Sequence, residues 1–479
     1  MAFILIPLVF VILSLVAPKG TVKYVGIAGG VASLFFTIAQ VVQFDPSSYH
    51  TMLNPEYTLP FGLTFEMGYD GIGLLMVALT NVMVPLILLS NFNKPESEDR
   101  LFNVMALFMQ MGLIGVFTAM DGIMFYIFWE ITLIPIFIIA YVYGSGERKK
   151  TLMKFFIYTF VGSLAMLLSL IAIGSYASDY SYVNLVAVQL EASKAYWIMG
   201  GFFLAFAIKI PLFPFHTWQP DTYSTAPTAG TMLLSALMLK MAFYGMVRWM
   251  IPLAPEALAD FKYIVIILGL IGIVYAAIIA IKQNDIKRLF AFASISHVGL
   301  IAAGIMLFDK PNLSAAFIQI LNHSLVAVGL FLAAGILENR LKTRTLQDMG
   351  GVAQVAPHFA FWFAVICFAS VSVPFTSGFI GEFLLLKGLY VDNWIIGSIA
   401  GTTLVFGAVY TLRAYQLSMF GHKEGLKFQD LTWNEWVTFF VLALIIVGIG
   451  VYPQVISQFI SPSLDNLFAK LQTAKTILP

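Results

Sequence analysis

The chain has 479 residues, of which 60% are hydrophobic and only 11% are charged, and its formal net charge is +1. Soluble proteins carry roughly 25% charged residues, so the composition excludes a soluble globular protein and indicates an integral membrane protein. The balanced charge gives no reason to expect nucleic acid as a partner. The single cysteine, Cys367, excludes disulfides, zinc clusters and iron–sulfur ligation within the chain, so we expect no redox chemistry here.

Apolar runs of about 20 residues, the length that crosses a bilayer as a helix, recur along the chain. The first, within MAFILIPLVFVILSLVAPKG, lacks the basic start and the cleavage site of a signal peptide, so we interpret it as a membrane helix. The sequence predicts an all-α polytopic membrane protein with fourteen spans, at 2–17, 24–43, 71–91, 101–119, 122–143, 152–176, 195–218, 226–251, 261–281, 286–307, 314–338, 357–389, 394–420 and 435–460.

The longest connection, residues 44–70, contains TLPFGLTFEMGYD, whose alternation and turn residues predict a β-hairpin on the membrane surface. Lysine and arginine gather in the connections after the odd-numbered spans, as in Arg148, Lys149 and Lys150. Basic loops stay in the cytoplasm, so we expect the hairpin and both termini on the periplasmic side of a bacterial plasma (inner) membrane.

Spans 7 and 12 differ from the others because proline interrupts each of them near mid-membrane, in IKIPLFPFH and SVPFTSGFIGEF. Pro211 and Pro374 are 163 positions apart, and spans 4 and 9 begin 160 apart, which indicates two similar five-helix units, spans 4–8 and 9–13. An odd number of helices per unit inverts the second copy, and inverted repeats with broken helices are typical of ion-coupled transporters. The expected divisions are 1–100 for three helices with the hairpin near 45–70, 101–251 for the first repeat, 261–420 for the second, and 435–479 for helix 14 and the tail.

Charged groups near the bilayer centre cost about 2.5–3.5 kcal/mol each on insertion scales, so those inside the predicted spans are candidates for function. Two acids, two bases and two histidines spread over spans 5 to 12 indicate a lateral chain of titratable groups. They are Glu130, Lys209, Lys240, His297, His323 and Glu382.

Each of these residues alone also has a structural interpretation. The ammonium of Lys240 can extend to the membrane interface, and Glu130 can lock two helices together in an ion pair. His297 can satisfy a backbone carbonyl near its helix start. His216 and His358 look like interfacial residues and are assigned no role.

The broken span 7 gives Lys209 a specific chemistry. Desolvation favours the neutral form of a lysine, whereas a nearby carboxylate favours the protonated form. If Glu130 approaches Lys209, the lysine keeps its proton, and if Glu130 moves away, the lysine becomes a proton donor. We therefore hypothesise a proton path gated by this ion pair, with water access and free carbonyls at the proline break.

Five stretches carry a specific resemblance that runs over most of the chain: FYIFWEITLIP, FAIKIPLFPFHTWQPD, APTAGTMLLSALMLKMAFYG, NDIKRLFAFASISHVG and SGFIGEFLLLKG. Their order and spacing resemble the antiporter-like subunits of respiratory complex I. The resemblance implies fourteen helices with two inverted five-helix repeats, and proton translocation coupled to NADH:quinone electron transfer. It also implies that FMN, iron–sulfur clusters and quinone belong to partner subunits. Other membrane subunits would flank this chain on both sides, and the peripheral redox arm would contact it indirectly.

The resemblance also assigns roles, residue by residue. Glu382 is the most diagnostic of the matched positions. Most subunits of this type have lysine there, and glutamate within the sequence GEF is characteristic of the subunit M, or subunit 4, type. The resemblance makes Glu382 the expected counterpart of Lys209. The matches are the helix-5 glutamate Glu130, the helix-7 lysine Lys209, the central helix-8 lysine Lys240, the relay positions His297 and His323 of helices 10 and 11, and the helix-12 position Glu382.

One departure from the family pattern is Tyr223. The family commonly reads PDAHS after the helix-7 break, whereas this chain reads PDTYS at residues 220–224. Tyrosine does not become cationic, so the role of that histidine is not carried over. Lys387, five residues after Glu382, is given no transport role.

Two other functions stay open at the level of sequence. One is a subunit of a multi-chain Na⁺/H⁺ antiporter, which shares the fold without a redox partner, and the other is a structural membrane anchor in a hydrogenase-type complex. Glu382 argues against the first. The internal charges argue against the second, because an anchor gains nothing from burying them.

Overall fold

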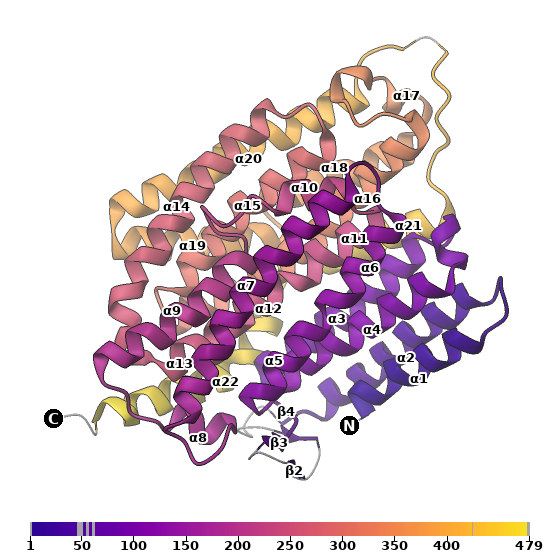
Figure 1. Ribbon diagram of the computed structural model, residues 1–479. Helices are drawn as coiled ribbons and strands as arrows, with labels where there is room; N and C mark the ends of the chain where they lie inside the picture. The colour runs from indigo at the N-terminus through magenta and orange to yellow at the C-terminus, as the bar shows by residue number, and fades with distance from the viewer. Residues whose placement is uncertain (1, 46–50, 54–56, 60–62, 424, 477–479) are drawn as a thin grey trace.

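The computed structural model describes residues 2–45, 51–53, 57–59, 63–423 and 425–476. These residues form a bundle in which most helices run side by side, with short strands at one end near the N-terminus (Figure 1). Eleven helical segments are long and apolar enough to cross a membrane. The shorter apolar helices α1 (Ala2–Val16) and α18 (Pro357–Ser370) and the interrupted helix α9 (Ala192–Lys209) account for the other three of the fourteen predicted spans.

The N-terminal part consists of three membrane helices and two antiparallel strand pairs. α1 and α2 (Val22–Gln43) precede the strands, and α3 (Gly71–Ser90) follows them. The predicted hairpin is present as β2 (Tyr57–Leu59) paired with β3 (Leu63–Phe65), while β1 (Thr51–Met52) pairs with β4 (Gly68–Tyr69). Residues 46–50, 54–56 and 60–62 of this predicted connection lie outside the described residues.

The two inverted five-helix repeats follow in chain order. Spans 4 to 8 are built from α4 (Arg100–Thr118), α5 (Gly122–Ile131), α6 (Leu133–Tyr143), α7 (Arg148–Gly174), α8 (Tyr182–Val186), α9, α10 (Gln219–Thr225), α11 (Thr228–Leu233), η3 (Leu234–Met238), α12 (Lys240–Gly245), η4 (Met246–Met250) and α13 (Ile251–Leu253). Spans 9 to 13 are built from η5 (Pro255–Ala257), α14 (Leu258–Lys282), α15 (Ile286–Ile305), α16 (Lys310–Leu341), η6 (Leu346–Asp348), α17 (Val352–Val355), α18, α19 (Ser377–Asp392) and α20 (Trp394–Met419). The residue boundaries expected for the repeats stay a prediction.

Both expected helix breaks are present. Span 7 is divided between α9 and α10, and span 12 is divided between α18 and α19. A proline inside a helix removes one backbone donor and its ring clashes with the preceding turn. The prolines at these two positions therefore divide each span into two half-helices.

The C-terminal segment differs from the predicted span 435–460. It forms two helices, α21 (Trp433–Val451) and α22 (Gln454–Thr476), which are separated at Pro453. Proline is tolerated in the first turn of a helix but not in its interior, so the first helix ends before Pro453 and a new one begins after it. Most of the expected tail is thus helical.

α22 lies across the same end of the bundle as the strands, where Figure 1 draws it in yellow. Ile460 and Leu464 are fully buried against the other helices. The backbone N–H of Gly71, at the start of α3, donates to the Ser463 hydroxyl at 2.8 Å. This helix therefore covers the ends of membrane spans and is not a fifteenth span.

The centre of the bundle is made of the most deeply buried helices. α16 and the segment from α11 to α13 are buried along their whole apolar window, and α15 is buried along 94% of it, whereas α2 is buried along only 28%. A helix that is apolar all round needs other helices or lipid around it. The central helices, which carry three of the six candidate residues, are therefore enclosed by protein.

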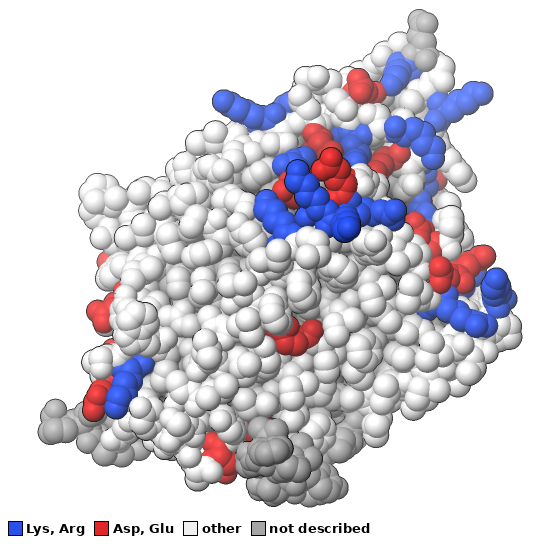
Figure 2. Space-filling model, viewed as in Figure 1, with Lys and Arg blue, Asp and Glu red and all other residues white. Residues whose placement is uncertain are grey.

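Basic side chains distinguish the two ends of the bundle. We call the end where α7 and α15 begin and α16 ends the basic end, and the end that carries the strands the hairpin end. Figure 2 shows most Lys and Arg side chains gathered at the basic end, above a broad and mostly uncharged belt that is interrupted by an acidic side chain near its middle. This distribution supports the expectation that the basic end faces the cytoplasm.

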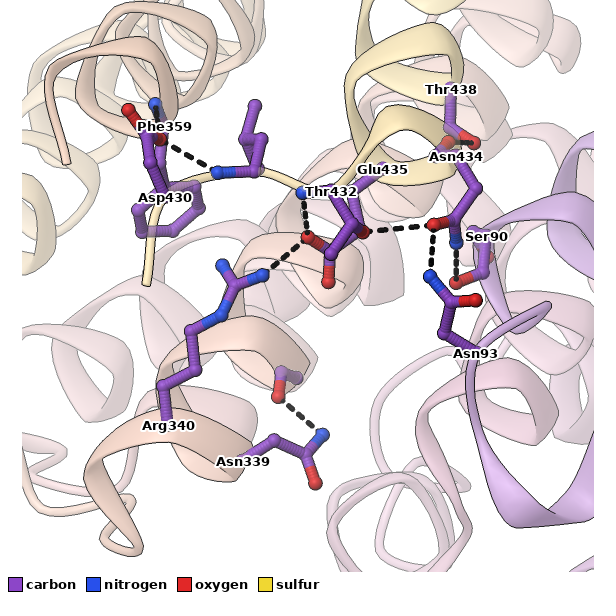
Figure 3. A network of polar contacts seen from close by, with 12 residues as sticks. Ser90, Asn93, Asn339, Arg340, Phe359, Asp430, Thr432, Asn434, Glu435 and Thr438 are labelled. Atoms are coloured by element: carbon purple, nitrogen blue, oxygen red, sulfur yellow. Dashed lines mark hydrogen bonds and ion pairs between the residues drawn. The ribbon is translucent and has the colours of Figure 1, made fainter. Parts of the chain in front are cut away.

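A polar network at the basic end joins helices that are distant in sequence (Figure 3). Its centre is Glu435 in the first turn of α21, which accepts from the Thr432 backbone N–H at 2.9 Å and pairs with Arg340 at 2.5 Å. Asn434 Nδ2 donates to the Ser90 carbonyl at 3.2 Å, at the end of α3. Nearby, Asp430 accepts from the Phe359 backbone N–H at 2.9 Å, at the start of α18. These contacts tie four helix ends together.

Candidate functional site

The first candidate group lies at the helix-7 break and combines Glu130 with Lys209. Lys209 is the last residue of α9 and is only 2% exposed. Its ammonium lies 5.4 Å from the centre of the Trp129 ring. The Glu130 carboxyl interacts with the Ser163 hydroxyl and, electrostatically, with Lys209. The two side chains do not approach within the 4 Å of an ion pair, so the structure holds the expected pair in an open arrangement.

The backbone before this break keeps its carbonyls satisfied. Leu212 N–H donates to the Ala207 carbonyl at 2.7 Å, and the indole N–H of Trp218 donates to the Ile208 carbonyl at 2.8 Å. These bonds replace the donors that Pro211 and its neighbours cannot supply. The half-helix therefore ends rigidly, with Lys209 in its last turn, where the helix dipole favours a cation.

Glu130 lies beside a second irregularity that the sequence analysis did not identify. Span 5 is divided into α5 and α6 at Thr132, whose hydroxyl donates to the Trp129 carbonyl at 2.8 Å. Pro135 cannot donate to the Ile131 carbonyl one turn earlier. The span thus passes from one helical segment to the next two residues after Glu130, while Thr132 keeps helical backbone angles.

The second group lies at the centre of the bundle and joins Lys240 to His323. Lys240 is completely buried, and its ammonium donates to the Ser235 carbonyl at 2.5 Å and lies 2.8 Å from His323 Nδ1. The other ring nitrogen, Nε2, lies 3.0 Å from the Ser294 hydroxyl. A protonated lysine has no acceptor, so it donates to Nδ1 and the ring then carries its own proton on Nε2. The three side chains form one continuous hydrogen-bonded chain.

The helix that carries Lys240 is not a regular α-helix. The π-helical turns η3 and η4 lie directly on either side of the short segment α12. π-turns are rare and occur mostly at functional sites, because the wider turn alters the direction of the side chains and frees carbonyl groups. Ser235, whose carbonyl accepts the Lys240 ammonium, lies within the first of them.

The third group surrounds Glu382, which is 1% exposed. One carboxylate oxygen lies 2.7 Å from His297 Nδ1 and accepts from Gln319 Nε2 at 3.0 Å. The other oxygen accepts from the Ser372 hydroxyl at 2.7 Å, and the far nitrogen of His297 meets the Tyr410 hydroxyl at 3.1 Å. Three donors converge on this single buried carboxylate.

Two pairs of the six candidate residues are in direct contact, Lys240 with His323 and His297 with Glu382. The supporting side chains were missed because they carry no charge. Their signal was present as polar residues at helical spacing within apolar segments. They are Ser294, Gln319, Ser372 and Tyr410.

The expectation that Glu382 is the positional counterpart of Lys209 needs correction. Lys209 precedes its helix break, whereas Glu382 follows its own. The 163-residue offset between Pro211 and Pro374 pairs Glu382 with Gln219. The same offset pairs Lys209 with Ser372, the residue that donates to Glu382.

The histidines given no role are placed differently from each other. His216 was expected at the interface but is 4% exposed, with its ring stacked on Phe213 at 5.7 Å and against Tyr275 at 5.3 Å. The proline-rich break turns this segment into the bundle, which the apolar pattern alone does not predict. His358 is exposed at the start of α18, as expected.

Comparison with known proteins identifies the family. The family model described as NADH:quinone oxidoreductase/Mrp antiporter, transmembrane, matches residues 119–407. The NADH-quinone oxidoreductase subunit M of Rickettsia conorii is 37% identical over 458 residues, 94% of this chain and 92% of that protein. The NADH-ubiquinone oxidoreductase chain 4 of Arabidopsis thaliana is 33% identical, over 97% of this chain and 96% of that protein.

A solved structure of respiratory complex I from Thermus thermophilus contains a chain that superimposes with a TM-score of 0.89 at 29% identity, over 98% of this chain and 99% of that chain. The likeness thus extends over nearly the whole fold, including the helices that carry the buried ionisable groups. The chain belongs to the antiporter-like, proton-translocating membrane subunits of respiratory complex I, the NADH:quinone oxidoreductase, and is of the subunit M (chain 4) type.

Proposed function

We propose that protons cross this complex I subunit along its buried ionisable side chains, through Glu130, Lys209, Lys240, His323, His297 and Glu382. The observation that carries the proposal is the hydrogen-bonded chain from Lys240 through His323 to Ser294 in the fully buried centre of the bundle. Burying ionisable groups inside a membrane costs free energy. A purely structural role would not explain why several such groups are buried here. Short contacts between donors and acceptors are the geometry that proton transfer requires.

The gating step is proposed at Lys209. Its ammonium has no hydrogen bond and no ion pair within 4 Å in the described part of the chain, while the Glu130 carboxyl lies near enough to interact with it. Closing the pair stabilises the protonated lysine and opening it favours release of the proton.

The proposed orientation of the subunit in the membrane follows from the different charges at the two ends of the bundle. The basic end would face the cytoplasm of a bacterial cell, and both termini would lie on the periplasmic side of its inner membrane. Other subunits of complex I are partners of this chain. We propose membrane subunits on both of its sides, with the peripheral redox arm acting on it indirectly.

Redox cofactors are assigned to the partner subunits. The one cysteine, Cys367, is buried, and within the described residues no group of three or more His, Cys, Asp or Glu side chains has the arrangement of a metal site. FMN, iron–sulfur clusters and quinone are proposed to belong to other subunits of the enzyme. This subunit would receive the energy of electron transfer through its neighbours.

The experiment replaces Lys240 by methionine, which keeps the length of the side chain and removes its charge. NADH-driven acidification of inverted membrane vesicles should fall at least tenfold, because the central chain loses its proton carrier. The exposed Lys149→Met serves as the control and should leave pumping unchanged. Co-purification of the other subunits and FMN content report on assembly. An assembled Lys240→Met enzyme that pumps at the full rate would contradict the proposed route.

A further inference from the structure

Two buried polar atoms on the short helix α10 make no well-formed hydrogen bond with any of the residues that the structure describes. They are the hydroxyl of Tyr223, whose side chain is completely buried, and the Oε1 atom of Gln219. The two residues are one helical turn apart, so their side chains share a face, and the Gln219 amide is the polar neighbour of the Tyr223 hydroxyl. Buried polar groups are normally paired with protein or with internal water. An unpaired hydroxyl and an unpaired amide oxygen side by side therefore call for an explanation.

Gln219 connects this helix to the central chain. Its Nε2 donates to the Ser294 hydroxyl at 3.5 Å, a long contact, and Ser294 is the residue that meets His323. Gln219 also stands where the 163-residue repeat offset places Glu382 in the second repeat. Each broken helix thus has a polar side chain at the same position after its proline. In the second repeat it contacts His297, and in the first it leads to His323.

The other end of α10 faces a cavity at the basic end. This cavity has a volume of about 310 Å³, and its lining includes Thr225, the last residue of α10. Its wall carries the buried Lys287, whose ammonium pairs with Glu338 at 2.8 Å. Asn91 Nδ2, which has no hydrogen-bond partner among the described residues, belongs to a residue that lines it. The cavity is polar enough to hold water.

Aromatic rings separate this cavity from the central chain. The Tyr223 ring packs edge-on against Phe331 with a centroid distance of 5.5 Å, and Phe331 packs against Phe290 at 6.3 Å. Water and protons do not pass readily through such an apolar layer. Among these three rings, only that of Tyr223 carries a hydroxyl.

We propose that the Tyr223 hydroxyl carries protons between the basic-end cavity and His323, and that Gln219 positions it. This inference rests on the proposed function. In each passage, the hydroxyl oxygen accepts a proton from the cavity side while its own proton leaves towards the Ser294 hydroxyl, directly or over an internal water held by Gln219. The passage starts when Lys240 is neutral, having passed its proton onward, and the proton of the neutral His323 ring is on Nδ1. Ser294 then passes its proton to Nε2 and the ring gives up the Nδ1 proton to Lys240, which leaves the protonated lysine donating to Nδ1 and the ring proton on Nε2. Tyr223, Ser294 and His323 end with the number of protons with which they began, and Lys240 gains the transferred proton.

The tyrosine changes the character of this step. The family commonly has histidine at the position, and an imidazole can hold an additional proton as a cation near pH 7. A phenol relays a proton only by accepting and donating at the same oxygen. The route through this chain therefore stays neutral between the cavity and His323.

The test compares Tyr223→Phe, which removes one oxygen atom, with Tyr415→Phe. The Tyr415 hydroxyl donates to the Ala360 carbonyl at 3.1 Å, between α20 and α18, and is not a member of the proposed route. NADH-driven acidification of inverted vesicles that hold the assembled enzyme should fall at least threefold for Tyr223→Phe and stay unchanged for Tyr415→Phe. Tyr223→His should restore more than half of the rate. Gln219→Leu provides a second variant with the same expected loss, should Tyr223→Phe not assemble.

Each other outcome separates the two proposals. Full pumping by Tyr223→Phe would overturn the inference, and so would a loss that Tyr223→His does not restore, because it would assign the ring a packing role. Lys240→Met is measured in the same preparation. If Lys240→Met pumps normally as well, the proposed function is wrong. If Lys240→Met does not pump and Tyr223→Phe pumps normally, only the proposed role of Tyr223 is wrong.

Discussion

The two broken helices hold their ionisable residues in opposite ways. Lys209 lies before its break and has no hydrogen bond within the described part of the chain. Glu382 lies after its break, and its carboxylate oxygens lie within hydrogen-bonding distance, at most 3.0 Å, of Ser372, Gln319 and His297. The first site is built so that a neighbouring carboxylate can approach or withdraw. The second is built so that a charge is held in place.

This difference indicates that the two repeats share an architecture but hold their ionisable residues for different purposes. A buried charge that is fully hydrogen-bonded is stable and costly to disturb. A buried ammonium without a partner is poised to lose its proton or to gain a counter-ion. An inverted pair of similar helices thus supplies one mobile site and one fixed site, and the following substitutions test that contrast.

The largest effect is expected for Glu382→Gln, which keeps the shape and removes the negative charge. One amide N–H would face the donors Gln319 or Ser372, so the free energy of unfolding should fall by about 1–3 kcal/mol. Vesicle acidification should fall at least tenfold because His297 loses its carboxylate. Both are measured, as pumping and as thermal inactivation of the purified enzyme. A fully active, equally stable variant would show that the route ends elsewhere.

A smaller effect on stability is expected for Lys209→Met. No hydrogen bond is lost, and an apolar side chain is better suited to this buried site, so the free energy of unfolding should change by less than about 1 kcal/mol or increase. Pumping should still drop about fivefold, since the gate loses its proton. A stability loss as large as that of Glu382→Gln, measured under the same conditions, would refute the contrast between the two breaks.

The smallest effect is expected outside the membrane spans, at Lys94, whose ammonium also makes no hydrogen bond to the residues that the structure describes. Burial lowers the pKa of Lys94, and the Glu435 carboxylate only partly opposes this. The protonated form is therefore disfavoured in the folded protein at neutral pH, and that penalty disappears as the pH rises through the lowered pKa towards the unfolded value. Lys94→Met should raise the midpoint of thermal inactivation by about 1 °C at pH 7.

The gain from Lys94→Met should shrink as the pH approaches 10, because the native lysine then becomes neutral in the folded protein. Exposed Lys149→Met, at the same end of the bundle, is the control and should show no gain at either pH. A gain that stays constant between pH 7 and 10 would assign the effect to packing and not to charge.

The sequence was sufficient for the membrane spans and for both breaks, because apolar runs and prolines act locally. It was also sufficient to select the six ionisable residues as candidates, since charge is conspicuous in an apolar segment, and their role in transport stays a prediction. It did not predict which of them touch. The contact of Lys240 with His323 depends on how helices 8 and 11 rotate against each other, which no local pattern records.

Neutral polar residues were the main omission. Ser294, Gln319 and Tyr410 are common in membrane helices as hydrogen-bonding groups between helices, so their types alone do not separate partners of a proton route from ordinary packing. α22 was missed for another reason. Its apolar residues continued the preceding span in the hydropathy pattern, and only Pro453 marks the boundary.

The π-turns of helix 8 have a consequence for the rotational phase of Lys240. Each π-turn accommodates one residue more than an α-turn would, so η3 and η4 act as single-residue insertions on either side of this lysine. Removing one residue from η3 would convert it to a regular turn and rotate Lys240 by about 100° relative to the preceding half of the helix. The Lys240 ammonium would then point away from His323 and lose its contact with Nδ1. The alignment of the central proton carrier thus depends on the length of its own helix as much as on the identity of its neighbours.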